Sequence, residues 1–308
     1  MKKRILFSLF SIVLSSLSAQ QTISELATYE LPVKTIKINH ETIAYTDEGS
    51  GDRTLVFVHG LSSNLDSWKK NLEGLTGNYR CIAIDLPGYG KSSRSKTDYS
   101  LAEYAKVLHD LVDNMKLSNV VLVGHSMGGQ IAMHSVLKYP QTYQKLILIA
   151  PAGIETFTEQ EASVMKSAYT PAMVVNTSDE QILANYKLNF YSFPDDAQSM
   201  VDDRIAMKEA EDFPDYAETV VSNIHAMLEE PVIDEIQNIK IPVLMIFGKN
   251  DMLIPNKYFH PSESIEGLIE TSEEKFQDLE VEVIDEAGHF VNFEKAEAVN
   301  ERIKIFLD

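Results

Sequence analysis

The sequence predicts a protein of the α/β class, built on an open, doubly wound, mostly parallel sheet that carries a helical insertion. Short runs rich in β-branched residues recur along the 308 residues, and helical periodicity lies between most of them. The later runs are continuously apolar, which is typical of strands that are buried on both faces of a parallel sheet. Strands that alternate with helices imply right-handed crossovers and therefore a doubly wound sheet.

The expected elements follow one another in a regular order. The first two strands flank Asn39-His40 and predict an antiparallel hairpin. Apolar residues then recur at helical spacing between positions 101 and 115, and a second helix is expected at Ile131–Leu137. The strand-like runs are Val33–Ile38, Thr42–Thr46, Thr54–Val58, Arg80–Ile84, Val120–Val123, Lys145–Ile149, Pro242–Phe247 and Glu280–Ile284.

The alternation stops between about residues 154 and 240. This stretch contains helix-like segments at Glu159–Ser167, Asp179–Leu188 and Tyr216–Leu228, but no convincing strand. We expect a helical cap over the carboxyl ends of the strands, where open α/β sheets bind ligands. Two interpretations of its five methionines stay open, namely helix packing and a deformable apolar wall for an acyl chain. They are Met165, Met173, Met200, Met207 and Met227.

The N-terminus has the pattern of a targeting segment. Lys2, Lys3 and Arg4 precede the apolar run Ile5–Leu17, and small residues lead up to Gln20. This order predicts a secretory signal peptide over residues 1–19, followed by a mature chain of residues 20–308. The run is short for a membrane span, although an uncleaved N-terminal anchor remains the alternative. We therefore expect an exported protein, periplasmic or extracellular, without a stable membrane span after processing.

Charge and cysteine content restrict the partners. The formal net charge is −19, and loss of the three basic residues at the N-terminus would make it about −22. Residues 154–240 hold 18 Asp and Glu against 5 Lys and Arg. Such a surface repels nucleic-acid phosphates and anionic lipid headgroups, so neither is an expected partner. Cys81 is the single cysteine, and its apolar surroundings predict a core residue.

A Gly-x-Ser-x-Gly motif occupies the expected turn between a strand and a helix. The motif is Gly124-His125-Ser126-Met127-Gly128, directly after the run Val120–Val123. A turn this tight strains the backbone of its middle residue, and small flanking residues let the two backbones approach. Ser126 is therefore the candidate nucleophile, and the Met127 N–H at the helix N-terminus is a candidate oxyanion donor.

A serine hydroxyl needs an adjacent base, and that base needs an orienting acid. Asp251 follows the strand Pro242–Phe247, and His289 follows the strand Glu280–Ile284. The carboxyl ends of parallel strands meet at one edge of a sheet, so we expect both side chains near Ser126. The chain order Ser, Asp, His is the order expected for a strand–turn–helix nucleophile of this kind.

A third turn completes the candidate site. His59-Gly60-Leu61 follows the strand Thr54–Val58, so the Leu61 N–H is a second candidate oxyanion donor. We interpret His59 as a structural residue that bonds within this turn. The remaining histidines lack metal-ligand spacing to one another or to cysteine, so no metal is expected. They are His40, His109, His134, His225 and His260.

Together these motifs resemble the α/β-hydrolase superfamily over about residues 35–308. The resemblance rests on His59-Gly60 with Trp68, the segment Asp85–Ser92, the Ser126 turn, Gly248–Asp251 and Gly288–Phe290. It implies an eight-stranded sheet with a variable helical cap, and a Ser126–His289–Asp251 triad that works without a cofactor. The spacing of 38 positions from Asp251 to His289 exceeds the expected spacing, so an extra loop or short helix is expected around Phe259–Thr271.

Within that superfamily the chain looks like the monoacylglycerol-lipase and esterase branch. Ser126 at the nucleophile position disfavours the branches that use Asp there, and Ser126–Gln130 with Pro151-Ala152-Gly153 resembles the esterases. The resemblance implies hydrolysis of carboxylic esters, with a medium acyl chain or a monoacylglycerol-like substrate. The acyl length, the alcohol part and the oligomeric state stay open.

Two alternatives remain beside ester hydrolysis. The first is carbon–carbon bond hydrolysis of ring-cleavage dienoates. Related enzymes bind these substrates through an arginine of the cap, and Arg204 is the one arginine of this cap. Against it, those enzymes carry Asn before the nucleophile and Trp after the histidine, where this chain has His125 and Phe290. The second is a non-catalytic binding protein of the same fold, although such proteins usually lose a triad residue.

Overall fold

The computed structural model describes residues 21–308, so the predicted signal peptide lies outside the described residues. Within them the chain forms one eight-stranded sheet with the order β1-β2-β4-β3-β5-β6-β7-β8. β1 pairs antiparallel with β2 and β2 antiparallel with β4, and every other pairing is parallel. The strands are β1 Lys34–Ile38, β2 Glu41–Glu48, β3 Thr54–Val58, β4 Arg80–Ile84, β5 Val120–His125, β6 Lys145–Ile149, β7 Val243–Gly248 and β8 Leu279–Ile284. The expected doubly wound α/β sheet is confirmed.

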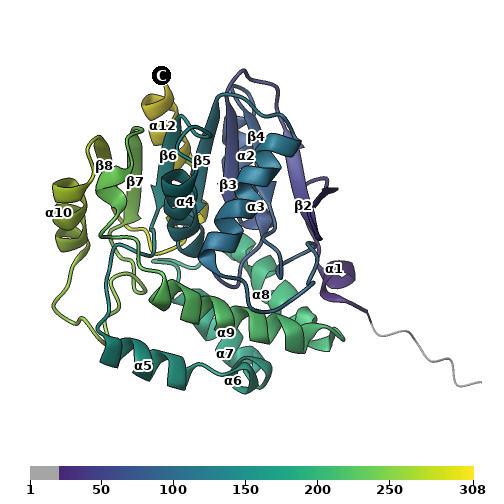
Figure 1. Cartoon of the computed structure of the whole chain (residues 1–308). Helices are drawn as coiled ribbons and strands as arrows, with labels where there is room; N and C mark the ends of the chain where they lie inside the picture. Colours follow the sequence, from purple (N-terminus) through teal and green to yellow (C-terminus); the bar gives the residue numbers. More distant parts are fainter. Residues whose placement is uncertain (1–20) are drawn as a thin grey trace, which may run out of the picture.

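Helices cover both faces of the sheet, which explains the continuous apolar runs. Along β3, Val56 and Val58 point into one core while Leu55 and Phe57 point into the other. This alternation follows from the two-residue period of a strand. α3 (Leu101–Asn114) and α4 (Met127–Lys138) pack on the first face, and α2 (Lys69–Leu75) and α12 (Ala296–Leu307) pack on the second (Figure 1).

Between β6 and β7 the described chain contains helices and no strand, as expected for the cap. These helices lie together below the sheet in Figure 1, at the end where the parallel strands finish. Thr158, Thr170 and Ser178 each cap the first turn of the helix that follows. The cap elements are α5 Glu159–Ala168, α6 Pro171–Val175, α7 Asp179–Lys187, η2 Asp195–Ala197, α8 Gln198–Ala206, η3 Met207–Glu209, α9 Phe213–Glu229 and η4 Ile236–Asn238.

Four further helices complete the described chain. The segment expected to contain an extra loop or short helix forms an irregular loop and then α10, which extends slightly beyond the expected range. None of the helices in residues 21–308 is both long and apolar enough to cross a membrane. The remaining helical elements are α1 Ile23–Leu26, η1 Leu65–Trp68, α10 Ile265–Lys275 and α11 Val291–Glu294.

Cys81 is a core residue, as expected. Cys81 on β4 is fully buried in the second core, and burial raises the pKa of its thiol to about 12. A thiol with this pKa stays protonated and unreactive near neutral pH.

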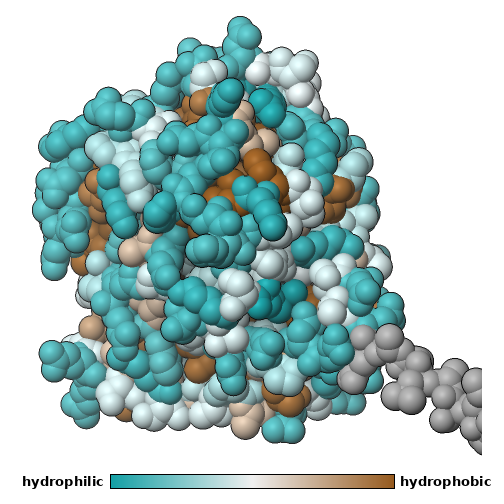
Figure 2. Space-filling view, turned by 45° about the vertical axis from the view of Figure 1, so that its right-hand side comes forward, coloured by the Kyte–Doolittle hydropathy of each residue, from teal (hydrophilic) through white to brown (hydrophobic). Residues whose placement is uncertain are grey.

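The face shown in Figure 2 is mostly hydrophilic, with apolar side chains in separated groups, as the large negative charge predicts.

The first described residues form a strap, residues 21–30, that joins the cap to the main domain. The Ile23 N–H donates to Asp212 Oδ1 at 2.8 Å, and the Thr28 hydroxyl donates to Asp203 Oδ1 at 2.6 Å. Both acceptors belong to the cap. This contact was not expected from the sequence, because α1 is a single turn and its partners lie about 180 residues away.

The strap also contacts the sheet side of the molecule. The Tyr29 hydroxyl donates to Asp85 Oδ2 at 2.8 Å, and Asp85 lies directly after β4. Ile23 is fully buried, and Ala27 is 6% exposed. The strap therefore ties the two parts together through apolar burial as well as through hydrogen bonds.

We expect Ile23→Ala to lower the free energy of unfolding by about 2–4 kcal/mol, because it removes a fully buried side chain between cap and main domain. Chemical denaturation measures this loss. Ile305→Ala is the matched control, since Ile305 is 67% exposed and its loss should cost less than about 0.5 kcal/mol. Equal losses in the two variants would show that the strap is not part of the cooperative fold.

Candidate active site

Ser126 lies on a strained turn between β5 and α4. Its φ of 53° and ψ of −120° are unusual for a residue with a side chain. Hydrogen bonds hold the strained backbone in place. The Ser126 N–H donates to the Ile149 carbonyl at 3.0 Å, and the Ser126 carbonyl accepts from the N–H groups of Gly129 and Ala152 at 2.9 and 3.1 Å.

Glycines let the two arms of this turn approach each other. A Cβ on Gly124 would lie 2.3 Å from the Gly128 carbonyl oxygen. A Cβ on Gly128 would lie 2.3 Å from the carbonyl oxygen of Val58 on β3. Since real Cβ atoms do not come this close to backbone, both motif glycines are required by packing.

Asp251 and His289 form a buried, hydrogen-bonded pair at the ends of β7 and β8. His289 Nδ1 lies 2.7 Å from Asp251 Oδ2, and the two side chains are 5% and 0% exposed. Asp251 Oδ1 accepts from the N–H groups of Leu253 and Ile254 at 2.8 and 3.0 Å. The carboxylate is therefore fixed from both sides, and donation by Nδ1–H leaves Nε2 of His289 free to accept a proton.

Ser126 and His289 line the same cavity, whose volume is about 990 Å³. The Ser126 hydroxyl makes no hydrogen bond to His289 within residues 21–308. In many enzymes the nucleophile and its base form a good hydrogen bond only after substrate binds. The arrangement is therefore compatible with proton transfer from Ser126 to His289.

His125, which precedes Ser126, holds the loop that carries His289. Its Nε2–H donates to the His289 carbonyl at 3.0 Å, and its ring centroid lies 4.8 Å from that of His289. Burial lowers the pKa of His125 well below its usual value, and neighbouring His289 lowers it further. His125 therefore stays neutral and holds one tautomer. In the sequence, His125 was notable only as a departure from the Asn of related enzymes.

The two candidate oxyanion donors flank Ser126. Leu61 lines the Ser126 cavity, and Met127 is the first residue of α4, where backbone N–H groups have no partner within the helix. His59 holds the Leu61 turn, as expected. Its Nδ1–H donates to the Gly60 carbonyl at 2.7 Å, its Nε2 accepts from Leu86 N–H at 3.1 Å, and burial lowers its pKa to about 4.

The cap methionines divide between the two interpretations. Met165, Met173 and Met227 line the Ser126 cavity, as an acyl wall requires. Met207 is 8% exposed and lies instead beside a separate cavity of about 20 Å³, so it does not contribute to such a wall. Met200 packs against a cluster of phenylalanines. Helix packing thus accounts for these last two residues.

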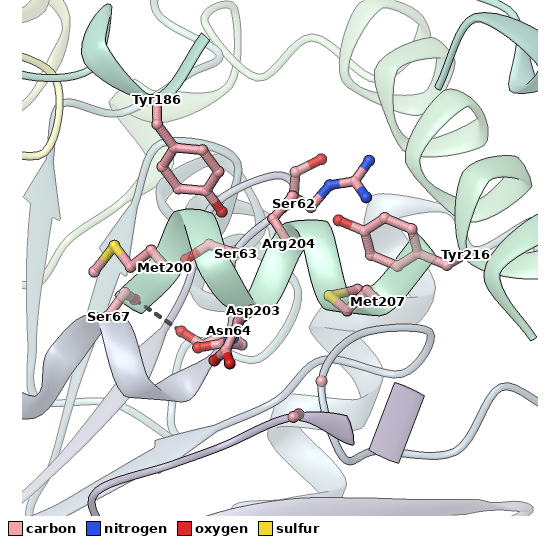
Figure 3. A pocket seen from close by; sticks show the side chains of 12 residues that line it. Ser62, Ser63, Asn64, Ser67, Tyr186, Met200, Asp203, Arg204, Met207 and Tyr216 are labelled. Carbon is pink, nitrogen blue, oxygen red and sulfur yellow. Dashed lines mark hydrogen bonds between the residues drawn. The ribbon is translucent and has the colours of Figure 1, made fainter. Parts of the chain in front are cut away.

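Arg204 is buried in the cap without an anionic partner. Its side chain lies over the rings of Phe213 and Tyr216, at 4.9 and 5.1 Å, and is 9% exposed. Within residues 21–308 its guanidinium makes no hydrogen bond or ion pair, and its Nη1 is fully buried. Figure 3 shows it among Ser62, Tyr186 and Tyr216.

Arg204 and Ser62 line a further cavity, of about 240 Å³, which shares Leu61 and Phe290 with the Ser126 cavity. A buried charge without a partner is costly, which favours an anionic group as the missing partner. Residues 21–308 contain no cluster of acidic, histidine or cysteine side chains placed to hold a metal ion.

A family model described as the alpha/beta hydrolase fold matches residues 53–296. The chain belongs to this family. The acetyltransferase component of an acetoin cleaving system from Cupriavidus necator is 27% identical over 265 residues, which cover 85% of this chain and 65% of that protein. The chain thus spans slightly less than two-thirds of that relative. A 2-hydroxy-6-oxononadienedioate/2-hydroxy-6-oxononatrienedioate hydrolase from Escherichia coli is 26% identical over 89% of this chain and 92% of its own.

Solved structures share the architecture of this alpha/beta hydrolase. A probable hydrolytic enzyme from Pseudomonas aeruginosa superposes with a TM-score of 0.83 at 21% identity, covering 94% of this chain and 99% of the other. An esterase from Exiguobacterium antarcticum gives a TM-score of 0.75 at 22% identity, covering 89% and 99%. At these identities the likeness concerns the fold alone.

We expect Gly128→Ala to destabilise this hydrolase by at least about 2 kcal/mol and to remove activity, because the new Cβ would meet the Val58 carbonyl. Denaturation measures the first effect, and an assay of hydrolase activity measures the second. Gly77→Ala is the matched control, since nothing lies within 4 Å of the place that its new methyl group would take. A stable, active Gly128→Ala protein would contradict the packing argument.

Proposed function

We propose that this alpha/beta hydrolase cleaves carboxylic esters through an acyl-enzyme on Ser126. The observation that carries the proposal is the shared cavity: Ser126 on its strained turn opens into the same space as His289, which Asp251 holds at 2.7 Å. A nucleophile, a base and an acid that orients the base are the groups that acyl transfer requires.

The proposed reaction has two halves. The Ser126 oxygen attacks the ester carbonyl while its proton passes to His289 Nε2, and the backbone N–H groups of Leu61 and Met127 bind the oxyanion. The tetrahedral intermediate then expels the alcohol, which takes the proton from His289. Water attacks the acyl-enzyme in the same manner, and the carboxylic acid leaves. Asp251 keeps the His289 tautomer and stabilises the imidazolium, and no cofactor takes part.

A medium acyl chain or a monoacylglycerol-like ester suits the cavity. Met165, Met173 and Met227 supply flexible apolar contacts, and the cavity volume of about 990 Å³ exceeds the needs of an acetyl group. Each buried methylene contributes about 0.8 kcal/mol, so affinity should rise with chain length until the wall is filled. We also propose that the enzyme acts outside the cytoplasm after removal of residues 1–19.

We expect Ser126→Ala, His289→Ala and Asp251→Asn each to lower kcat by several orders of magnitude without unfolding the chain. The three groups act as one unit, so combining Ser126→Ala with His289→Ala should cost little more than Ser126→Ala alone. Ester hydrolysis by the purified variants measures this, with circular dichroism as the folding control.

Two results would contradict this account. One is multiplicative losses in the double variant. The other is labelling by a fluorophosphonate probe that persists in the Ser126→Ala variant. An intact chain that the probe does not label at all would favour the non-catalytic alternative.

Carbon–carbon bond hydrolysis is the second candidate, and Arg204 is the observation that favours it. Its side chain, whose guanidinium has no partner within residues 21–308, lines the cavity beside Leu61 and Phe290, where the far end of a bound acyl group would lie. A dienoate carries a carboxylate that this guanidinium would bind. One relative is named for hydrolysis of such dioic substrates, although His125 and Phe290 depart from the residues of that branch.

We expect Arg204→Gln to lower kcat/KM for a dienedioate substrate at least a hundredfold, and to change kcat/KM for a neutral ester less than fivefold. The reason is that the variant removes the charge partner of one substrate only. Lys208→Gln is the matched control, because it removes one cap charge that is paired with Asp179 and lines neither cavity. Equal losses on both substrates would assign Arg204 a structural role.

A further inference from the structure

Exposed apolar side chains concentrate on one part of the molecule. Of the nine large apolar side chains that the described surface exposes, eight belong to the cap or to the loop 251–264 that follows β7, and the ninth is Ile305 on α12. These two segments hold only about a third of the described residues. We call the eight the apolar rim: Val164, Tyr169, Met173, Leu188, Tyr191, Met252, Leu253 and Tyr258.

The two segments of the apolar rim are in direct contact. His260 Nδ1 of the loop lies 2.5 Å from Glu155 Oε1 at the start of the cap. The Asn256 N–H donates to the same carboxylate, and Phe157 stacks on His260 with ring centroids 5.1 Å apart. In Figure 1 the chain between β7 and α10 descends to the end of α5. These contacts hold together the two segments that carry the rim.

The apolar rim continues into the Ser126 cavity. Tyr169, Met173, Leu188 and Leu253 line that cavity and are also 38–50% exposed at the surface. These four side chains thus give an apolar molecule contacts both at the surface and inside the cavity that holds the nucleophile. A group of exposed apolar side chains at the mouth of a cavity favours an interaction site there.

We propose that the apolar rim docks on a neutral lipid surface, from which the ester substrate enters the cavity. This inference rests on the proposed ester hydrolysis. Charge selects the kind of surface: residues 154–240 hold 18 acidic against 5 basic residues, so an anionic bilayer would repel the cap. An uncharged or zwitterionic surface exerts no such repulsion, and apolar insertion alone then provides the binding.

The point where the described chain begins favours the same orientation. The carbonyl of Gln21 accepts from the N–H of Glu211, so the chain enters at the cap. The apolar run of residues 5–17 ends only four positions earlier, a reach of about 14 Å at most. If that run were retained as an anchor, it would hold the cap and not the opposite end of the sheet against the bilayer.

Partition onto vesicles tests the docking without depending on catalysis. The chain from Gln20 onward, in a Ser126→Ala background, is mixed with phosphatidylcholine vesicles and sedimented. The rim variant replaces Val164, Tyr191 and Tyr258 by Gln, three residues that are exposed but do not line the cavity. Ile305→Gln is the matched control, because it removes an equally exposed apolar side chain on another face.

We expect the rim variant to partition at least tenfold more weakly than the Ile305→Gln control. Adding phosphatidylglycerol to the vesicles should weaken partition of the chain that keeps its rim. Equal partition of rim variant and control would overturn the proposal, and so would stronger binding to the anionic vesicles. A dimer of the chain that the rim variant dissociates would instead assign the rim to a second copy.

Hydrolysis separates this proposal from the proposed function. With Ser126 intact, the rim variant should keep its rate on soluble p-nitrophenyl acetate within twofold and lose at least tenfold on an ester dispersed in phosphatidylcholine vesicles. If neither ester is cleaved while partition still depends on the rim, the proposed function fails and the docking surface stands. If both esters are cleaved equally by variant and control, the docking surface fails and the function stands.

Discussion

The close packing of β5 against the first turn of α4 is the constraint on which the site depends. Backbone atoms occupy the space where side chains at Gly124 and Gly128 would lie, so only glycine allows the turn. A strained residue such as Ser126 costs about 1–3 kcal/mol, and this cost is met by the backbone hydrogen bonds to Ile149, Gly129 and Ala152. Because β3 and β6 supply part of this packing, the position of one hydroxyl depends on the centre of the sheet.

Burial and hydrogen bonds also fix the position of the candidate base, His289. Asp251 is removed from water, and the three groups that donate to its carboxylate replace the lost hydration. His125 is held neutral by burial beside His289. Since His125 donates to the His289 carbonyl, the residue before the nucleophile and the loop that carries the base are linked directly.

The sequence allowed the sheet, the Ser126 turn and the Asp251 and His289 positions to be predicted, because each depends on local pattern. Buried strands are apolar runs, and a tight turn requires glycine. Tertiary features escaped prediction. The strap pairs Ile23 with Asp212, a contact that no local pattern encodes. For the same reason the sequence did not show which cap methionines line the Ser126 cavity. The single-turn helix α6 was too short to show periodicity.

Two of the contacts that tie the cap to the main domain limit how it can select substrates. At one end the strap bonds both Asp212 and Asp85. At the other, Glu155 accepts from the loop that follows Asp251 and pairs with His260. Burial lowers the pKa of His260, but the carboxylates of Glu155 and Glu161 together raise it above its usual value, so this second tie is strongest while His260 is charged. Glu155 also lines the Ser126 cavity. The entrance and the acid of the candidate triad are therefore held by the same contacts, so a change in the cap wall that disturbs Glu155 would alter catalysis together with specificity.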